Sequence, residues 1–189
     1  MPLRELSLRH KKNEWTGKMY IGRHLMVLAA VLLLAACGGG QPESRFKTYR
    51  GPAVTHVVVH KGARKMYLLH HDQIMKVYNV GLGFNPEGDK KVEGDGKTPE
   101  GLYFIDRRNP NSRFHLSLGI DYPNAADRAE ARYLGKSPGG DIFIHGRPAA
   151  YQNGIWDWTW GCIAVTDSEM EDIYSMIRTD NPTPILIMP

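Results

Sequence analysis

The sequence predicts a mostly β domain with a few helices, beginning near Val54. Short apolar stretches rich in β-branched and aromatic residues recur from there onward, separated by turn residues. Only two segments combine helix caps with helical periodicity. A chain of 189 residues has room for about one domain, and no internal repeat indicates a second.

The first half of this domain predicts a meander of three strands. The stretches are "THVVVHKG", "KMYLLHH" and "QIMKVYNVGLG", and the last of them is expected to end at Gly81 and Gly83. The following "FNPEGDKKVEGDGKTPE" is dense in Gly, Pro and charge, which is typical of loops or hairpin tips. A further strand, "GLYFI", comes after it.

The second half alternates strands with the two helices. "RFHLSLGI" predicts a strand, and a helix should run from Asn124 to Leu134, capped by Asn124 and stopped by Gly135. "DIFIHG" and "GCIAV" predict short buried strands, joined by the loop "RPAAYQNGIWDWTW". A second helix begins at Thr166, which has capping-box spacing to Glu169. "TPILIMP" predicts a final strand.

The N-terminal region has the features of a processed leader. Twelve apolar residues, "LMVLAAVLLLAA", precede Cys37, and such a run is short for a membrane span. "LAAC" resembles a bacterial lipobox, which implies cleavage before Cys37 and lipid on its sulfur. The alternative is an ordinary buried helix. We therefore expect a lipoprotein signal peptide over 1–36, with an over-extended start because Met19 would open a signal of usual length.

Residues 37–52 are then expected to form the lipidated cysteine and a flexible tether, and 53–189 the folded domain. Gly38 is not the aspartate that resembles an inner-membrane retention signal. The expected location is thus the cell envelope, on an outer-membrane lipid anchor facing the periplasm. Residues 1–36 hold six Lys/Arg and two Asp/Glu, which leaves 18 of each in the remainder. A neutral domain provides no argument for nucleic-acid binding.

The chain has two cysteines, and if Cys37 carries lipid, Cys162 has no disulfide partner within the chain. His145 ends one predicted strand and Cys162 opens another. If these strands are neighbours, the imidazole can accept the thiol proton. Gly161 lets a carbonyl approach the backbone, so N–H groups there can stabilise an oxyanion. The carbonyl of Gly146 can orient the imidazole.

Each of these features also has a purely structural interpretation. Taken alone, a buried cysteine is usually inert and a buried histidine is usually a satisfied polar residue. Trp156, Trp158 and Trp160 predict either a lid over the substrate or loop packing. A zinc site is weakly indicated because no close pair of ligands occurs. The sequence predicts no metal and no cofactor.

"IHG" followed by "TWGCIAV" resembles the active-site motif of L,D-transpeptidase (YkuD-type) catalytic domains, a histidine, a spacer and then Ser/Thr-His-Gly-Cys. The resemblance covers Val54 to the C-terminus and implies a β-sandwich or barrel-like fold. It implies Cys162 as nucleophile, His145 as base and Gly146 as the orienting carbonyl. Thr159 and Gly161 match the motif, whereas Trp160 replaces its second histidine. Ala164 also replaces the usual Arg or Asn.

The resemblance implies an acyl-transferase that forms a thioester with peptidoglycan stem peptides and contributes to cell-wall organisation and cell shape. Trp160 and Thr159 would contact the substrate. His115 would border the cleft, and Arg113, with Arg107 or Arg108, would receive its carboxylates. Two alternatives stay open. One is a hydrolase of the same family, an L,D-carboxypeptidase or an amidase acting on a murein-bound lipoprotein; the other is a non-catalytic peptidoglycan-binding lipoprotein.

Overall fold

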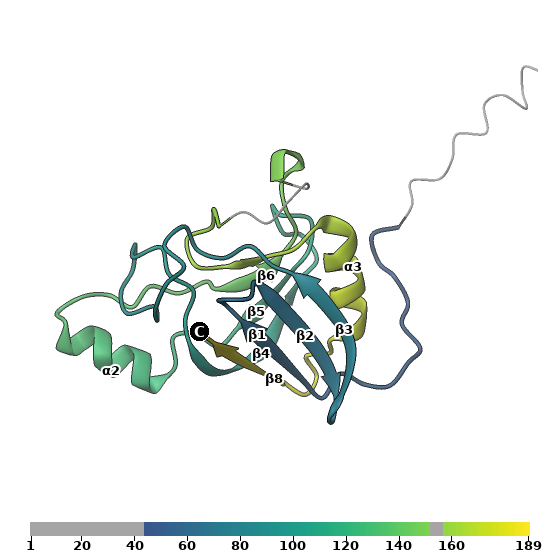
Figure 1. Ribbon diagram of the computed structural model, residues 1–189, viewed down its shortest axis with the longest axis horizontal. Coiled ribbons are helices and arrows are strands. Elements are labelled where there is room, and N and C mark those ends of the chain that lie inside the picture. The colour runs from purple at the N-terminus through teal and green to yellow at the C-terminus, as the bar shows by residue number, and fades with distance from the viewer. Residues whose placement is uncertain (1–43, 152–156) are drawn as a thin grey trace, which may run out of the picture. The chain divides into compact units, whose positions relative to one another are not determined.

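The computed structural model describes residues 44–151 and 157–189, and the residues from Arg45 to Pro189 form one compact unit. Eight strands make a single sheet in the order β3-β2-β1-β8-β4-β5-β6-β7 (Figure 1). The strands are β1 (His56–His60), β2 (Lys65–His70), β3 (Gln73–Asn79), β4 (Gly101–Asn109), β5 (Ser117–Ile120), β6 (Phe143–His145), β7 (Ile163–Ala164) and β8 (Thr183–Met188). The helices are α2 (Ala125–Tyr133), α3 (Asp167–Met176) and the short 3₁₀ turn η1 (Ala149–Tyr151). The mostly β fold class is confirmed.

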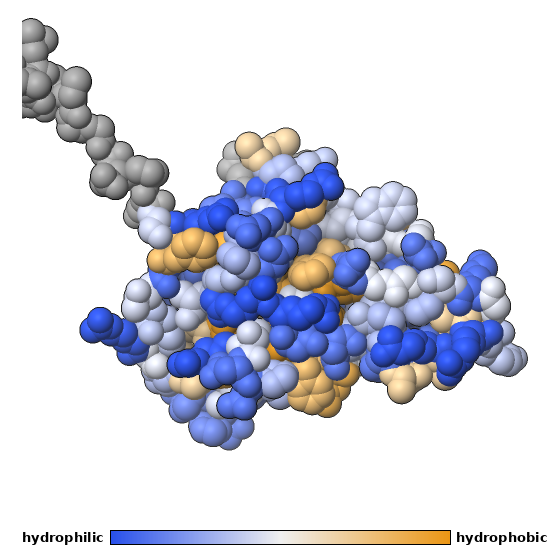
Figure 2. Space-filling model, turned by 180° about the vertical axis from the view of Figure 1, so that it is seen from behind, coloured by the Kyte–Doolittle hydropathy of each residue, from blue (hydrophilic) through white to orange (hydrophobic). Residues whose placement is uncertain are grey.

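Alternation along the central strands builds the core. Every second side chain is buried on β1, β2, β8 and the first half of β4, because successive residues point to opposite faces of the sheet. The buried set includes Val57, Val59, Met66, Leu68, Tyr103, Ile105, Ile185 and Ile187. On the other face, Leu102, Phe104 and Leu186 stay partly exposed. On the side of the molecule that Figure 2 shows, apolar residues form separate patches among polar ones.

The predicted meander is confirmed, since β1 pairs antiparallel with β2, and β2 with β3. The C-terminal strand β8 lies between β1 and β4, parallel to the first and antiparallel to the second. The last strand of the chain is therefore central in the sheet. It joins the N-terminal meander to the half of the sheet that carries the candidate site.

The third strand ends earlier than predicted, at Asn79 rather than at the glycines. Gly81 and Gly83 instead form isolated bridges to Ala164 and Thr159, on either side of Cys162. The predicted strand over 113–120 is likewise shorter, because residues 113–116 form turns and His115 has a φ of 68°. These departures place loops, not strands, around the site.

Both helices begin where the caps predicted. Asn124 caps α2 in a capping box with Asp127, and Thr166 caps α3 in one with Glu169. Gly135 follows α2 with a φ of 63°, the left-handed conformation that ends a helix. The helix α3 contacts β5 and β6, while α2 lies at the other end of the domain (Figure 1).

The compact unit begins within the segment predicted as a tether. The ammonium of Lys47 lies 2.8 Å from a carboxylate oxygen of Asp172 on α3. Arg45 donates a hydrogen bond to the carbonyl of His115. The ring of Phe46 lies 6.3 Å from that of Tyr174. Residues 45–52 thus belong with the domain. The predicted signal peptide over 1–36, Cys37 and the first residues of the predicted tether, up to residue 43, lie outside the described residues. Among the described helices, none is long and apolar enough to span a bilayer.

Candidate active site

Strand pairing brings His145 and Cys162 to one side of the sheet. Strands β6 and β7 are parallel, with Ile144 opposite Ile163 and both side chains buried in the core. The residues before and after Ile144 therefore point to the opposite face. Cys162 directly precedes β7, and its Sγ accepts a hydrogen bond from the backbone N–H of Phe143 at 3.4 Å.

The two side chains open on a common cavity of about 520 Å³. Its lining comes from the end of β4, the turn after it, β5, β6 and the residue before β7. The lining residues are Asn109, Asn111, Ser112, Arg113, Phe114, Ser117, Asp141, Phe143, His145 and Cys162. The described part of the chain has no group of three or more side chains that could hold a metal ion. Cys162 lines this cavity and is partly exposed.

A backbone carbonyl holds the imidazole of His145. Its Nδ1 lies 2.6 Å from the carbonyl oxygen of Gly146. A carbonyl only accepts hydrogen bonds, so Nδ1 carries the proton and Nε2 keeps a lone pair. Phe114 stacks on the ring at 4.5 Å, and Trp158 packs edge-on at 5.8 Å. The imidazole is therefore fixed in one tautomer and one orientation.

Burial keeps both groups in their neutral forms. It lowers the pKa of His145, and the nearby Arg147 guanidinium lowers that pKa further, against the opposing effect of the Gly146 carbonyl. Burial likewise raises the pKa of the Cys162 thiol, although the Phe143 N–H acts in the opposite direction. A neutral imidazole beside a neutral thiol is ready to accept a proton when a substrate arrives.

The pH dependence of Cys162 acylation should reveal this neutral imidazole at its acidic end. We expect the rate of Cys162 acylation to fall as pH drops through a pKa below the usual histidine value of about 6.5. A lowered pKa means that the neutral base is present from a lower pH upward. Single-turnover mass spectrometry across pH would measure the midpoint. The exposed His71 in the β2–β3 turn offers a control, since His71→Gln should not move it. A midpoint at or above the usual value would contradict this prediction.

The turn before Cys162 is braced by Thr159. Its hydroxyl donates to the carbonyl of Cys162 at 2.7 Å and accepts from the N–H of Gly161 at 3.1 Å. This hydroxyl therefore engages the Gly161 N–H, one of the backbone N–H groups around Gly161 and Cys162 that were predicted as oxyanion donors. Gly161 has a φ of 128°, and a Cβ on it would lie 2.5 Å from the carbonyl oxygen of Lys97. Its place in the site is to allow this close backbone approach.

An ion pair with the β1–β2 turn holds the segment that leads to Cys162. Arg64, in the β1–β2 turn, donates from Nε and Nη2 to the carboxylate of Asp157 at 2.7–3.1 Å. The same carboxylate accepts from the N–H of Leu82 at 2.9 Å. Asp157 opens the "DWTWGC" stretch, so it anchors the turn that carries Cys162. Sequence reasoning missed this pair, because its members are 93 positions apart.

Breaking the Arg64–Asp157 ion pair should slow acylation of Cys162 without unfolding the domain. We expect Arg64→Ala to lower the acylation rate by about tenfold to a hundredfold, because small displacements of reacting groups carry costs of that size. Arg64→Lys should restore little of the rate, since an ammonium cannot reproduce the bidentate fork. The exposed Arg178–Asp180 pair provides the control, and Arg178→Ala should leave the rate unchanged. An Arg64→Ala rate equal to wild type would contradict the prediction.

Of the predicted substrate-binding side chains, Arg113 lines the cavity. It forms no ion pair with any described residue. Arg107 donates to the carbonyl of Ile120, and Arg108 stacks on the Tyr174 ring at 3.8 Å, so both are engaged elsewhere. His115 also turns away, because its Nε2 lies 2.9 Å from a carboxylate oxygen of Glu171 on α3.

The tryptophans before Cys162 differ in their surroundings. Trp158 stacks on Tyr151 at 4.9 Å and packs against Phe114 and His145, which is the loop-packing alternative. Trp160 is 69% exposed and lies outside the lining of the cavity that holds the thiol. Trp156 lies outside the described residues.

The site combines a partly exposed thiol with a neutral imidazole that a backbone carbonyl holds in place. The two groups lie at neighbouring strands of a mostly β domain. This arrangement defines a class of cysteine–histidine domains suited to acyl transfer. Comparison with known proteins places the chain within this class. Residues 54–187 match the L,D-transpeptidase catalytic domain (YkuD), so the chain belongs to that family. The motif read from the sequence and the family match therefore agree.

Three relatives show the extent of the similarity. The YafK protein of Escherichia coli (strain K12) is 31% identical over 107 residues, covering 56% of this chain and 38% of YafK. The crystal structure of the helical cell shape determining protein Pgp2 from Campylobacter jejuni is 27% identical, with a TM-score of 0.56 over 78% of this chain and 51% of that one. Bd1075 of Bdellovibrio bacteriovorus is 25% identical, with a TM-score of 0.52 over 76% and 50% of the two chains. The chain thus spans about half the length of the two solved structures, Pgp2 and Bd1075. It covers less than half of the length of YafK.

Proposed function

We propose that this chain is a cysteine acyl-transferase that modifies peptidoglycan stem peptides through a thioester on Cys162. The proposal rests on one observation above all: the thiol and the carbonyl-anchored imidazole of His145 line the same cavity. Membership of the L,D-transpeptidase family supports it. The substrate class is carried over from that family.

The first half-reaction follows from these positions. Nε2 of His145 accepts the thiol proton as Sγ attacks the carbonyl of the diamino acid in the stem peptide. The C–N bond to the terminal D-alanine then breaks, and the proton passes from the imidazole to the leaving amine. A thioester remains on Cys162. Arg113, on the cavity wall, can bind a substrate carboxylate through its guanidinium.

The second half-reaction depends on which nucleophile attacks the thioester. Attack by an amine of a second stem peptide gives a cross-link, and attack by water gives hydrolysis; either restores the thiol. Trp160, at the position of the family's second histidine, cannot supply an imidazole donor. We propose transfer as the main activity, with the hydrolase as the second candidate that this substitution favours.

The location is part of the same proposal. The apolar run and "LAAC" before Cys37 support a lipid anchor in the cell envelope, facing the periplasm. The substrate would then be within reach of the domain. A role in cell shape is proposed by similarity to Pgp2, the helical cell shape determining protein of Campylobacter jejuni.

Mass spectrometry of the reaction products tests the proposal. The full chain in detergent would be incubated with disaccharide tetrapeptide and, separately, with murein that carries a lipoprotein. Cross-linked dimers with loss of D-alanine would establish transfer. Monomeric tripeptide or released lipoprotein without dimers would identify the hydrolase. A wild-type protein that forms neither product nor a thioester adduct would refute both activities.

A further inference from the structure

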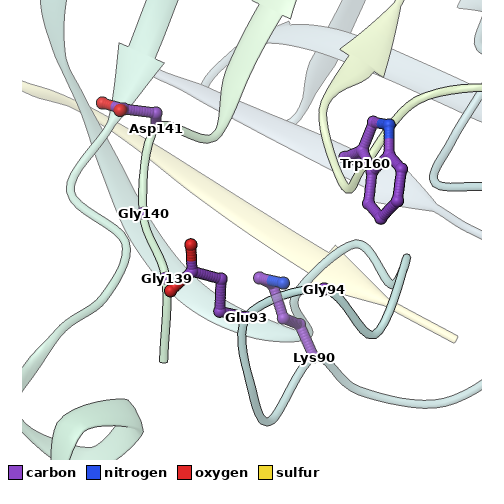
Figure 3. A pocket seen from close by; sticks show the side chains of 7 residues that line it. All are labelled: Lys90, Glu93, Gly94, Gly139, Gly140, Asp141 and Trp160. Carbon is purple, nitrogen blue, oxygen red and sulfur yellow. The ribbon is translucent and has the colours of Figure 1, made fainter. Parts of the chain in front are cut away.

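A second hollow of about 390 Å³ adjoins the cavity of the thiol. Asp141 lines both, and its carbonyl accepts a hydrogen bond from Cys162 Sγ at 3.5 Å. The other lining residues are Lys90, Glu93, Gly94, Gly139, Gly140 and Trp160. In Figure 3, Trp160 stands across the hollow from Gly139, Gly140 and Asp141. A group bound here would therefore lie beside the acylated cysteine.

Trp160 presents a large apolar surface to solvent in a fixed orientation. Its indole packs edge-to-face against Phe84, with ring centroids 4.8 Å apart and an interplanar angle of 85°. Phe84 is held in turn, since its N–H donates to the carbonyl of Thr159 at 2.9 Å and its ring lies against Gly96. A ring fixed in this way loses little freedom when a ligand stacks on it.

The rest of the hollow is polar and open. The exposed carboxylates of Glu93 and Asp141 form no ion pair with the described residues, so they can accept hydrogen bonds from a ligand. The glycines add no side chains to the floor. The ammonium of Lys90 is buried and paired with Asp95 at 2.9 Å, so the charge that faces a ligand is that of the two carboxylates.

We infer that this hollow binds a pyranose ring of the peptidoglycan glycan, an inference that rests on the proposed function. A sugar ring has an apolar C–H face that packs on an indole, and hydroxyl groups that donate to carboxylates. The exposed indole of Trp160 and the two carboxylates that line the same hollow match that chemistry. The stem peptide is attached to the glycan only a few residues from its diamino acid, so an extended stem reaches from one site to the other.

Binding of a glycan without any peptide tests this inference. The probe is chitotetraose, titrated by calorimetry into the full chain carrying Cys162→Ala, which prevents turnover. We expect saturable binding that Trp160→Ala weakens at least tenfold and Trp160→Phe weakens less. Tyr133 on α2 is 90% exposed and lies outside the hollow, so Tyr133→Ala is the matched control and should change the affinity less than twofold.

Three results would overturn the inference. These are no binding of chitotetraose, equal losses for Trp160→Ala and Tyr133→Ala, and binding at Trp160 of tetramethylammonium in place of the sugar. Its failure is made distinct from that of the proposed function by repeating the product analysis on the wild-type chain with a tetrapeptide that carries no sugar. Acylation of Cys162 by that peptide without glycan binding would refute only the inference. Glycan binding without acylation would refute only the proposed function.

Discussion

Replacing Cys162 with alanine is expected to abolish the thioester adduct and to reduce turnover by at least about a thousandfold. Transfer and hydrolysis both pass through this adduct, so both should be lost. Intact-mass spectrometry after incubation with disaccharide tetrapeptide would measure the adduct directly. A persistent adduct on the alanine variant would show that another residue is the nucleophile.

The same variant should remain folded. The thiol is partly exposed, and its contacts with Phe143 N–H at 3.4 Å and Asp141 O at 3.5 Å are long. Their loss should change the free energy of unfolding by no more than about 1 kcal/mol. Thermal melting by circular dichroism is the check. Equal murein binding by both proteins, with no adduct even on wild type, would favour the non-catalytic lipoprotein.

Gly161→Ala should cause the second large loss, in activity and in stability together. A φ of 128° strains any residue with a Cβ, which costs about 1–3 kcal/mol. The new Cβ would also lie 2.5 Å from the carbonyl oxygen of Lys97, so the backbone must shift. That shift moves Cys162, and we expect acylation to fall by at least about a hundredfold.

Gly135→Ala separates backbone strain from steric contact. Gly135 also has a positive φ, 63°, but a Cβ there meets no atom within 4 Å. It follows α2, outside the lining of either cavity. We expect Gly135→Ala to lower the melting temperature slightly and to leave acylation unchanged. If the two variants lost activity equally, the close approach at Gly161 would not be what positions the cysteine.

Much of the fold was predictable because the signals are local. The meander follows from alternating apolar residues, and both helices begin at the residues whose side chains satisfy the first N–H groups, Asn124 and Thr166. Strand ends were less predictable. Residues 113–116 alternate polar and apolar side chains as a strand would, but they form a turn, with a positive φ at His115 and its contact with Glu171, and the strand begins only at Ser117.

The candidate site divides in the same way. The pair of His145 and Cys162 could be proposed from sequence, since each borders a glycine at the end of an apolar stretch. The role of Arg64 could not, because it depends on a contact with Asp157 across 93 positions. Among the three arginines suggested for the substrate, side-chain packing alone leaves Arg113 on the cavity.

The sequence by itself determined the mostly β class, the helix starts, the family motif and the identity of the candidate nucleophile and base. These depend on residue type and short spacing, which a linear chain displays directly. Only the tertiary structure decided that β8 lies at the centre of the sheet, that the Gly161 N–H is occupied by Thr159, and that Trp160 faces a separate hollow. Each of these depends on which distant backbone or side chain comes into contact, and packing energy over the whole domain sets such contacts.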